Sequence, residues 1–185
     1  MKTALLAIDY INGIMGGYDE PKRQAIVSNA NKVIAVCREQ GMPIYFVRLA
    51  FDAQYSGKPK HSNMFNYLQQ NERFQLQKPD TEFVSALDVL ATDVVINKTG
   101  ASPFCGNNLQ QQLQANNIER LIFAGVATDN AIDIGVRQAH DDGYYTVVIE
   151  DACAASTDEF HQWPITMLKK IANTIVTADE FINKE

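Results

Sequence analysis

The sequence predicts an α/β fold in which helices cover both faces of one parallel sheet. Apolar runs of strand length alternate with amphipathic segments along nearly the whole chain, and this alternation implies right-handed crossovers between parallel strands. Several of the runs are continuously apolar, as strands buried on both faces must be. At 185 residues the chain is long enough to bury a full core, and we expect one domain, residues 1–185.

The first half of the chain supplies two strands, one helix and a long excursion. Residues 3–10 (TALLAIDY) and 43–50 (PIYFVRLA) are the strands. Residues 21–40 are predicted as a helix because their apolar positions keep helical spacing, and Gly41 ends it. Residues 51–79 lack clear periodicity and are expected to form an irregular excursion containing one short helix.

The second half repeats the strand–helix alternation. Residues 80–90 suit a helix with Asp80 as its N-cap. The remaining predicted elements are strands at 93–98, 119–125 and 144–150, helices at 107–115, 129–142 and 157–172, and a short sixth strand with a terminal turn within 174–181.

Composition and charge exclude several classes of protein. The formal charge of −6 and the isoelectric point near 5.0 carry no electrostatic signature of nucleic-acid binding. No apolar run is long enough for a membrane span, and the chain leads into a strand without a signal-like segment, so we expect a cytoplasmic protein. The three cysteines are odd in number and widely spaced, which disfavours a disulfide framework and a zinc motif. Phosphate and dinucleotide motifs are missing from the sequence, and no cofactor is expected.

Polar residues at the carboxyl ends of the strands are the candidate site, because ligands of open parallel sheets bind there. Asp9 ends the first strand after an unbroken apolar run, and Lys98 ends the third. A cation beside a partly buried carboxylate keeps the carboxylate ionised, while burial favours the protonated form. Such opposed effects can tune a proton-transfer group.

The turn after the fourth strand, residues 125–131 (GVATDNA), is the third part of the candidate site. It precedes a helix, so its backbone N–H groups are expected to face the crevice and hold an oxyanion or carboxylate. Thr128 or Asp129 could equally serve as an ordinary helix cap.

Each of these side chains also has a purely structural interpretation. Asp9 could cap a turn, and Lys98 could be a solvated strand end. Cys105, in the segment SPFCG, precedes a predicted helix whose N-terminus could lower the pKa of a thiol. A free cysteine is, however, usually a small buried apolar residue.

Three segments together, LLAIDYINGIM, VVINKTGASPF and LIFAGVATDNAID, resemble the isochorismatase-like hydrolase superfamily, which includes cysteine hydrolases and isochorismatases proper. The resemblance implies a three-layer α/β/α sandwich whose six-stranded sheet has the order 3-2-1-4-5-6. It also implies an Asp–Lys–Cys triad at the positions of Asp9, Lys98 and Ala131, and a cis peptide near Val126-Ala127.

The sequence departs from this family pattern at several positions. Ala131 stands where cysteine hydrolases carry the nucleophile, and Ile11 stands where many members carry glutamine. The segment FDAQ (51–54) has Asp52 but no histidine two residues later, so neither a metal site nor nicotinamidase activity is expected.

Three explanations of Ala131 remain open. The enzyme could work without a covalent nucleophile, as the resemblance to isochorismatases proper implies. Asp9 would then be a general acid that protonates a vinyl ether before water adds, or it would serve an amide-type hydrolysis together with Lys98. Alanine could be an engineered replacement of a native cysteine. The chain could also be a non-catalytic relative that binds small molecules or partners.

By resemblance we expect a homo-oligomer, a dimer or larger, and a small-molecule substrate. The excursion at 51–79 is also expected to supply apolar pocket wall. The expected substrate-binding residues are Tyr10, Ile14, Phe104, Ala127, Thr128 and Asn130.

Overall fold

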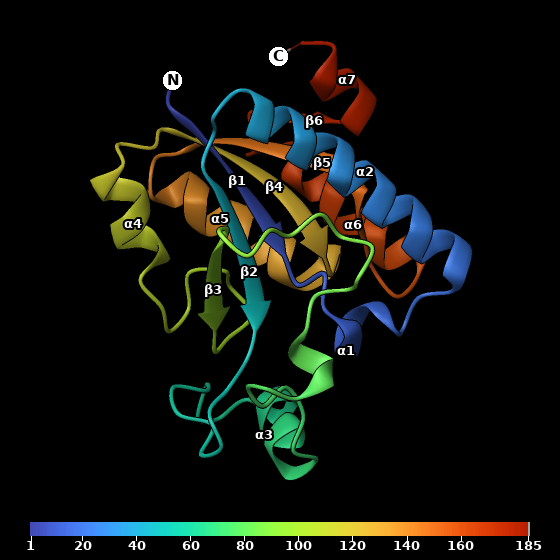
Figure 1. Ribbon diagram of the computed structural model, residues 1–185, viewed down its shortest axis with the longest axis vertical. Helices are drawn as coiled ribbons and strands as arrows, with labels where there is room; N and C mark the ends of the chain where they lie inside the picture. Colours follow the sequence, from blue (N-terminus) through green and yellow to red (C-terminus); the bar gives the residue numbers. More distant parts are fainter. Residues whose placement is uncertain (185) are drawn as a thin grey trace.

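The computed structural model describes residues 1–184 and contains a six-stranded sheet of order β3-β2-β1-β4-β5-β6, with every pair of neighbouring strands parallel (Figure 1). This confirms the predicted fold class and strand order. The strands are β1 Thr3–Ile8, β2 Ile44–Leu49, β3 Val94–Lys98, β4 Arg120–Val126, β5 Tyr145–Ala154 and β6 Thr174–Val176. The helices are α1 Asn12–Met15, α2 Glu20–Glu39, α3 Asn63–Gln70, η1 Pro79–Thr81, α4 Leu109–Ala115, η2 Thr128–Ile132, α5 Asp133–Asp141, α6 Asp158–Leu168 and α7 Ala178–Ile182.

Two apolar cores lie on opposite faces of the sheet. Helices α2 and α7 pack on one face, and α4, α5 and α6 pack on the other (Figure 1). Alternation along β1 feeds both cores: Leu5 and Ala7 belong to the first, and Leu6 and Ile8 to the second. All six residues of β1 are buried, which is why this strand has a continuously apolar sequence.

The excursion between β2 and β3 stands beyond the carboxyl ends of the strands (Figure 1). It contains the short helix α3, as predicted, which begins where the Ser62 hydroxyl accepts a hydrogen bond from the Phe65 N–H. A third apolar cluster holds it together, with Phe51, Tyr55, Phe65 and Phe74 among its buried members. The excursion therefore has a small core of its own above one edge of the sheet.

The predicted helix at 80–90 is wrong. The structure has a short 3₁₀ turn, η1, followed by irregular backbone. Asp80 does not cap a helix, because its Oδ2 accepts hydrogen bonds from the Phe74 N–H and the Arg73 guanidinium. A side chain of α2 instead forms hydrogen bonds with the irregular backbone. The Asn31 amide donates to Ala86 O and accepts from the Asp88 N–H.

Several other boundaries differ from the predicted ones. β5 continues to Ala154, four residues beyond the predicted strand end. The first turn of the helix after β4, η2, is a π-turn. Helix α6 ends at Leu168 rather than at 172, and the expected terminal turn is the short helix α7. Among the described residues, no helix is both long enough and apolar enough to cross a bilayer.

Gly125 allows β1 and β4 to approach closely at their carboxyl ends. Its φ is 153°, and a Cβ at this position would lie 2.3 Å from Ile8 O. Any side chain would therefore push the end of β4 away from β1. This close approach brings the residue after β1, Asp9, beside the turn that follows β4.

Candidate active site

The side chains of Asp9 and Lys98 form a buried ion pair at the carboxyl edge of the sheet. The Lys98 Nζ lies 2.8 Å from the Asp9 Oδ2, and their side chains are 2% and 3% exposed. Asp9 follows β1 with a φ of 58°, and its N–H continues the sheet by donating to Val47 O. Lys98 ends β3 and reaches across the end of β2, which lies between β1 and β3.

Backbone groups complete the coordination of this pair. The Leu49 N–H donates to the Asp9 Oδ1 at 2.7 Å. The Lys98 ammonium donates to Ala101 O at 2.8 Å and to Gly100 O at 3.2 Å. Burial raises the pKa of the Asp9 carboxyl above its ordinary value of 3.8, although the Lys98 charge and the Leu49 hydrogen bond act in the opposite direction. Asp9 can therefore carry a proton at a higher pH than an exposed aspartate.

A cavity of about 190 Å³ opens beside the pair. Its polar residues are Asp9, Lys98 and Asn130, and the rest of its wall is apolar side chains and small residues. Four parts of the chain supply the wall: the strand ends with the loop after β3, the short helix α1, the turn after β4, and the excursion after β2. The remaining wall residues are Ile14, Leu49, Met64, Phe65, Leu68, Phe74, Gly100, Ala101, Ala127 and Ala131.

The turn after β4 presents Ala131 to this cavity. The Val126-Ala127 peptide is cis, as the family resemblance implied. Ala131 is buried and lies in the first turn of the helix that η2 and α5 form together. The Asn130 and Ile132 N–H groups both donate to Ala127 O, so these two groups are already engaged within the turn.

The structure gathers six of the nine predicted site residues around the cavity: Asp9, Lys98 and Ala131 with Ile14, Ala127 and Asn130. Tyr10 instead points into the α2 side of the core, where its hydroxyl donates to Ala152 O at 2.6 Å. Phe104 packs in the core on the opposite face. Thr128 Oγ1 lies 2.8 Å from His161 Nδ1 of α6. These three side chains are not part of the cavity wall.

The sequence predicts that the excursion supplies pocket wall, but it does not identify which of its residues line the cavity. Met64, Phe65 and Leu68 come from α3, and Phe74 follows it. Ser62 followed by Phe65 and Leu68 is a capping residue with apolar positions three apart, a signal that indicates a short helix with one apolar face.

Cys105 does not line the cavity. It packs against Gly100, where an added Cβ would lie 2.4 Å from the Cys105 Sγ. The thiol therefore supports the loop that bends back over Lys98. This placement favours the structural interpretation of Cys105 over a nucleophilic one.

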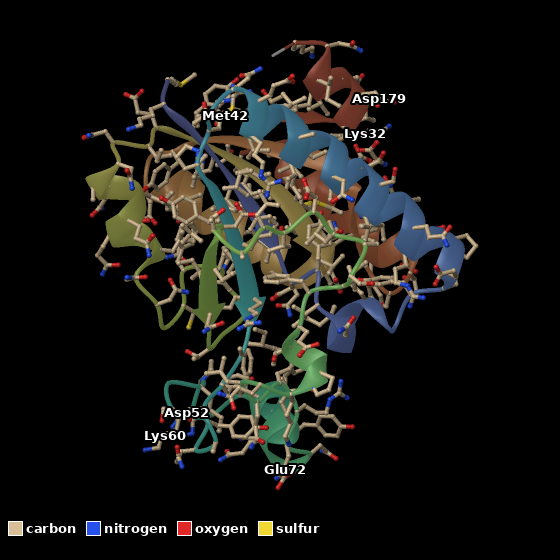
Figure 2. The ribbon with its side chains drawn as sticks, in the orientation of Figure 1. Lys32, Met42, Asp52, Lys60, Glu72 and Asp179 are labelled. Atoms are coloured by element: carbon tan, nitrogen blue, oxygen red, sulfur yellow. The ribbon has the colours of Figure 1, made fainter. Side chains whose placement is uncertain are left out.

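The residues of the excursion do not fit a metal site. Asp52 Oδ1 accepts hydrogen bonds from the Gln54 and Ser56 N–H groups, and Asp52, Lys60 and Glu72 lie on the outer side of the excursion (Figure 2). Within residues 1–184, no three His, Cys, Asp or Glu side chains are grouped closely enough to hold a metal ion.

A larger cleft of about 350 Å³ lies between the first turns of α2 and residues 84–86. Its charged side chains, Glu20 and Arg23, pair with each other at the surface. The cavity beside Asp9 is the stronger candidate, because it combines an apolar wall with a buried titratable pair.

Comparison with known proteins identifies a family and a shared fold. A family model described as "Isochorismatase domain" matches residues 3–180. The chain is 26% identical to the ureidoacrylate amidohydrolase RutB of Acinetobacter baylyi, over 98% of this chain and 83% of that protein. It is 27% identical to the uncharacterized isochorismatase family protein YecD of Escherichia coli O157:H7, over 98% and 95% of the two chains. A cysteine hydrolase structure from Pseudomonas syringae superposes with a TM-score of 0.87 at 20% identity, covering 98% of this chain and 91% of the other.

Proposed function

The chain belongs to the isochorismatase family, and on that premise we propose that it is a hydrolase that adds water to a small molecule without a covalent cysteine intermediate. The observation that carries the proposal is the buried Asp9–Lys98 pair in the wall of an apolar cavity that also receives the methyl group of Ala131. A methyl group cannot attack a carbonyl, so the covalent step of a cysteine hydrolase is not available at position 131. The Asp9–Lys98 pair is the part of the site that is left for proton transfer.

Asp9 is the proposed proton-transfer group. It lines the cavity, its Oδ1 accepts a hydrogen bond from the Leu49 N–H, and its Oδ2 accepts one from the Lys98 ammonium. A carboxylate can accept about four. The remaining lone pairs can meet a substrate or a water molecule. Burial raises the Asp9 pKa, which supports a protonated carboxyl acting as general acid.

In the general-acid route, Asp9 donates its proton to the vinyl carbon of a vinyl ether. A water oxygen then bonds to the neighbouring carbon, and one water proton returns to Asp9. As the resulting hemiketal collapses, its hydroxyl proton passes to the leaving oxygen and the carbon–oxygen bond to that oxygen breaks, which releases an alcohol and a ketone. Lys98 is the positioning residue in this route, because it holds the carboxyl in place from β3.

In an amide or ester substrate, ionised Asp9 takes a proton from water while the water oxygen bonds to the carbonyl carbon. Negative charge then develops on the carbonyl oxygen, and turn N–H groups not engaged by Ala127 O are the proposed donors for it. The proton held by Asp9 passes to the leaving nitrogen or oxygen as that bond breaks.

A second candidate function is ligand binding without turnover. The observation that favours it is the internal satisfaction of the site: Lys98 has three acceptors, and two turn N–H groups bond to Ala127 O. A site stabilised in this way could hold a small molecule without any chemistry.

Turnover of a substrate panel separates the two functions. The panel comprises isochorismate, small neutral amides, esters and vinyl ethers, and ureidoacrylate, which is named for the Acinetobacter relative. We expect Asp9→Asn to lower kcat by about 10²–10⁴-fold for any compound turned over. Asn tolerates the positive φ at this position, so the fold is expected to persist.

Asp179→Asn is the matched control, because Asp179 pairs with Lys32 on the surface, far from the cavity. This variant is expected to keep full activity. Turnover that is equally fast in Asp9→Asn would contradict a role for Asp9 in proton transfer. No turnover of any compound, with ligand binding unchanged by Asp9→Asn, would favour the binding function.

We also propose a cytoplasmic location and a homo-oligomeric state. The support for assembly is the exposed aromatic surface of α6, where Phe160 and Trp163 are 52% and 66% exposed. Sedimentation equilibrium of the wild type and of Trp163→Ala tests this. A monomeric wild type would contradict the proposed assembly.

A further inference from the structure

We infer that the cavity beside Asp9 selects an uncharged small molecule, one with an apolar body and a single carbonyl-like polar end. The inference rests on the proposed function for the identity of the site. The charges in the cavity that are free to meet a ligand determine the substrate class.

Lys98 has no free donor for a ligand. An ammonium has three N–H bonds, and those of Lys98 are directed at Asp9 Oδ2, Ala101 O and Gly100 O, at 2.8, 2.8 and 3.2 Å. Its charge is also balanced at contact distance by ionised Asp9, the state in which Asp9 acts on an amide or ester. Within the described residues, Lys98 is the one cationic side chain in this cavity wall. An anionic ligand therefore meets no uncompensated positive charge from a side chain.

The helix N-terminus next to the cavity also provides little positive charge and few N–H donors for an anionic ligand. Asp129 lies in the first turn of this helix and is exposed, so its negative charge offsets the positive end of the helix dipole. Asp133, in the same region, is paired with Arg137 at 2.9 Å. The Asn130 and Ile132 N–H groups bond to Ala127 O, which leaves fewer donors for a carboxylate.

The opposite wall is apolar. Ile14, Met64, Phe65, Leu68 and Phe74 face the cavity, and the whole space is about 190 Å³. This is below the usual size of a pocket for drug-like molecules. A small ring or short alkyl body fits this wall, whereas a carboxylate placed against it would lose its hydration without compensation.

The cavity wall still offers a ligand hydrogen-bond acceptors and donors, and a neutral polar group can use both. Asp9 has unused lone pairs, and Asn130 in the cavity wall has a side-chain amide that can donate or accept. A neutral amide, ester or vinyl ether can use both. Isochorismate itself carries two carboxylates, so the charge balance of this cavity disfavours it.

Three probes of nearly equal size and shape test the charge preference: benzamide, benzoate and benzamidine, which are neutral, anionic and cationic at pH 7. Binding to the wild-type protein is measured by isothermal titration calorimetry and by ligand-observed NMR at millimolar concentrations. We expect benzamide to bind at least about tenfold more tightly than either charged probe. Equal or tighter binding of benzoate or benzamidine would overturn the inference, and so would failure of all three to bind.

Variants of α3 locate the binding and reverse the preference. Leu68→Trp fills the cavity and should weaken benzamide binding at least about tenfold. Met64→Trp should also fill the cavity, and it replaces Leu68→Trp in the test if that variant does not fold. Met64 is 44% exposed, so a larger side chain is tolerated more easily there. Met64→Lys adds a free cation and should raise benzoate affinity at least about tenfold over the matched Met64→Gln. Benzamide binding that none of these folded variants changes would place the ligand elsewhere and overturn the inference.

Failure of this inference and failure of the proposed function give different results. Benzamide selectivity without turnover of any panel compound leaves the charge preference intact and contradicts the hydrolase. Asp9-dependent turnover of isochorismate supports the hydrolase and overturns the preference for uncharged substrates.

Discussion

Replacing Lys98 by methionine removes the ammonium from the buried pair and keeps an unbranched, largely apolar side chain in its place. The change leaves Asp9 with its Leu49 hydrogen bond but without a counter-charge. It also leaves Gly100 O and Ala101 O without the donor that they share. Breaking a buried pair in this way costs about 3–5 kcal/mol of stability.

The pH dependence of this loss has a definite sign. Burial already raises the Asp9 pKa above 3.8, and Lys98 is the largest effect that opposes the rise. Without Lys98 the folded-state pKa rises further, so the contribution of Asp9 to stability is present below the unfolded pKa and is lost as pH rises through the folded pKa. The deficit of Lys98→Met relative to wild type should therefore grow from about pH 4 to about pH 7.

Urea denaturation at several pH values measures this effect. Lys32→Met is the matched control, because Lys32 pairs with Asp179 at the surface between α2 and α7 (Figure 2), and an exposed pair contributes about 0–1 kcal/mol. Adding Asp9→Asn to Lys98→Met should recover part of the loss, since no buried charge then remains. Equal losses for the two lysine variants, or a deficit that shrinks as pH rises, would contradict a buried Asp9 charge that depends on Lys98.

Two further predictions concern the surroundings of the turn after β4. Gly125→Ala should destabilise the fold by about 2–4 kcal/mol, because it adds a clash with Ile8 O to an unfavourable φ. Gly41→Ala, which has a positive φ but open space around it, should cost less in the same thermal unfolding assay, and an equal cost would contradict the clash. His161 should titrate below its ordinary value of 6.5 by NMR, because burial lowers the pKa of its imidazole. Its contribution to stability is then present above that value and lost as pH falls through the folded pKa, and titration at or above 6.5 would contradict its burial.

The sheet and the centre of the site could be predicted because both follow from local patterns. Continuous apolar runs identify the strands, and parallel strands place their carboxyl ends at one edge. Asp9 follows such a run and Lys98 ends the third strand, and the strand order that the family resemblance implied places both near each other at this edge. The expected position of Ala131 beside them rests on the turn after β4 and on the family resemblance.

The other residues of the cavity wall and the structure around them could not be identified from the sequence, because their positions depend on long-range contacts. Residues 80–90 contain a helix-like pattern, yet the Asn31 side chain on α2 binds the backbone of this segment and makes irregular structure favourable. The orientation of Tyr10 is set by Ala152, which lies 142 residues away in sequence. The excursion contributes Met64 and Leu68 through a helix that is too short for a strong periodic signal.

The most direct test of the account uses Ala131→Cys with p-nitrophenyl acetate, a small uncharged ester. Ala131 lines the cavity, so a thiol there should meet the substrate beside Asp9. We predict that intact-protein mass spectrometry and peptide mapping find an acetyl group at position 131 in this variant, and that Ala131→Ser shows far less. The wild type should carry no acetyl group on any residue of the cavity wall. An acetylated cavity residue in the wild type, or a folded Ala131→Cys variant that is not acetylated at position 131, would contradict a cysteine-hydrolase site that lacks only its nucleophile.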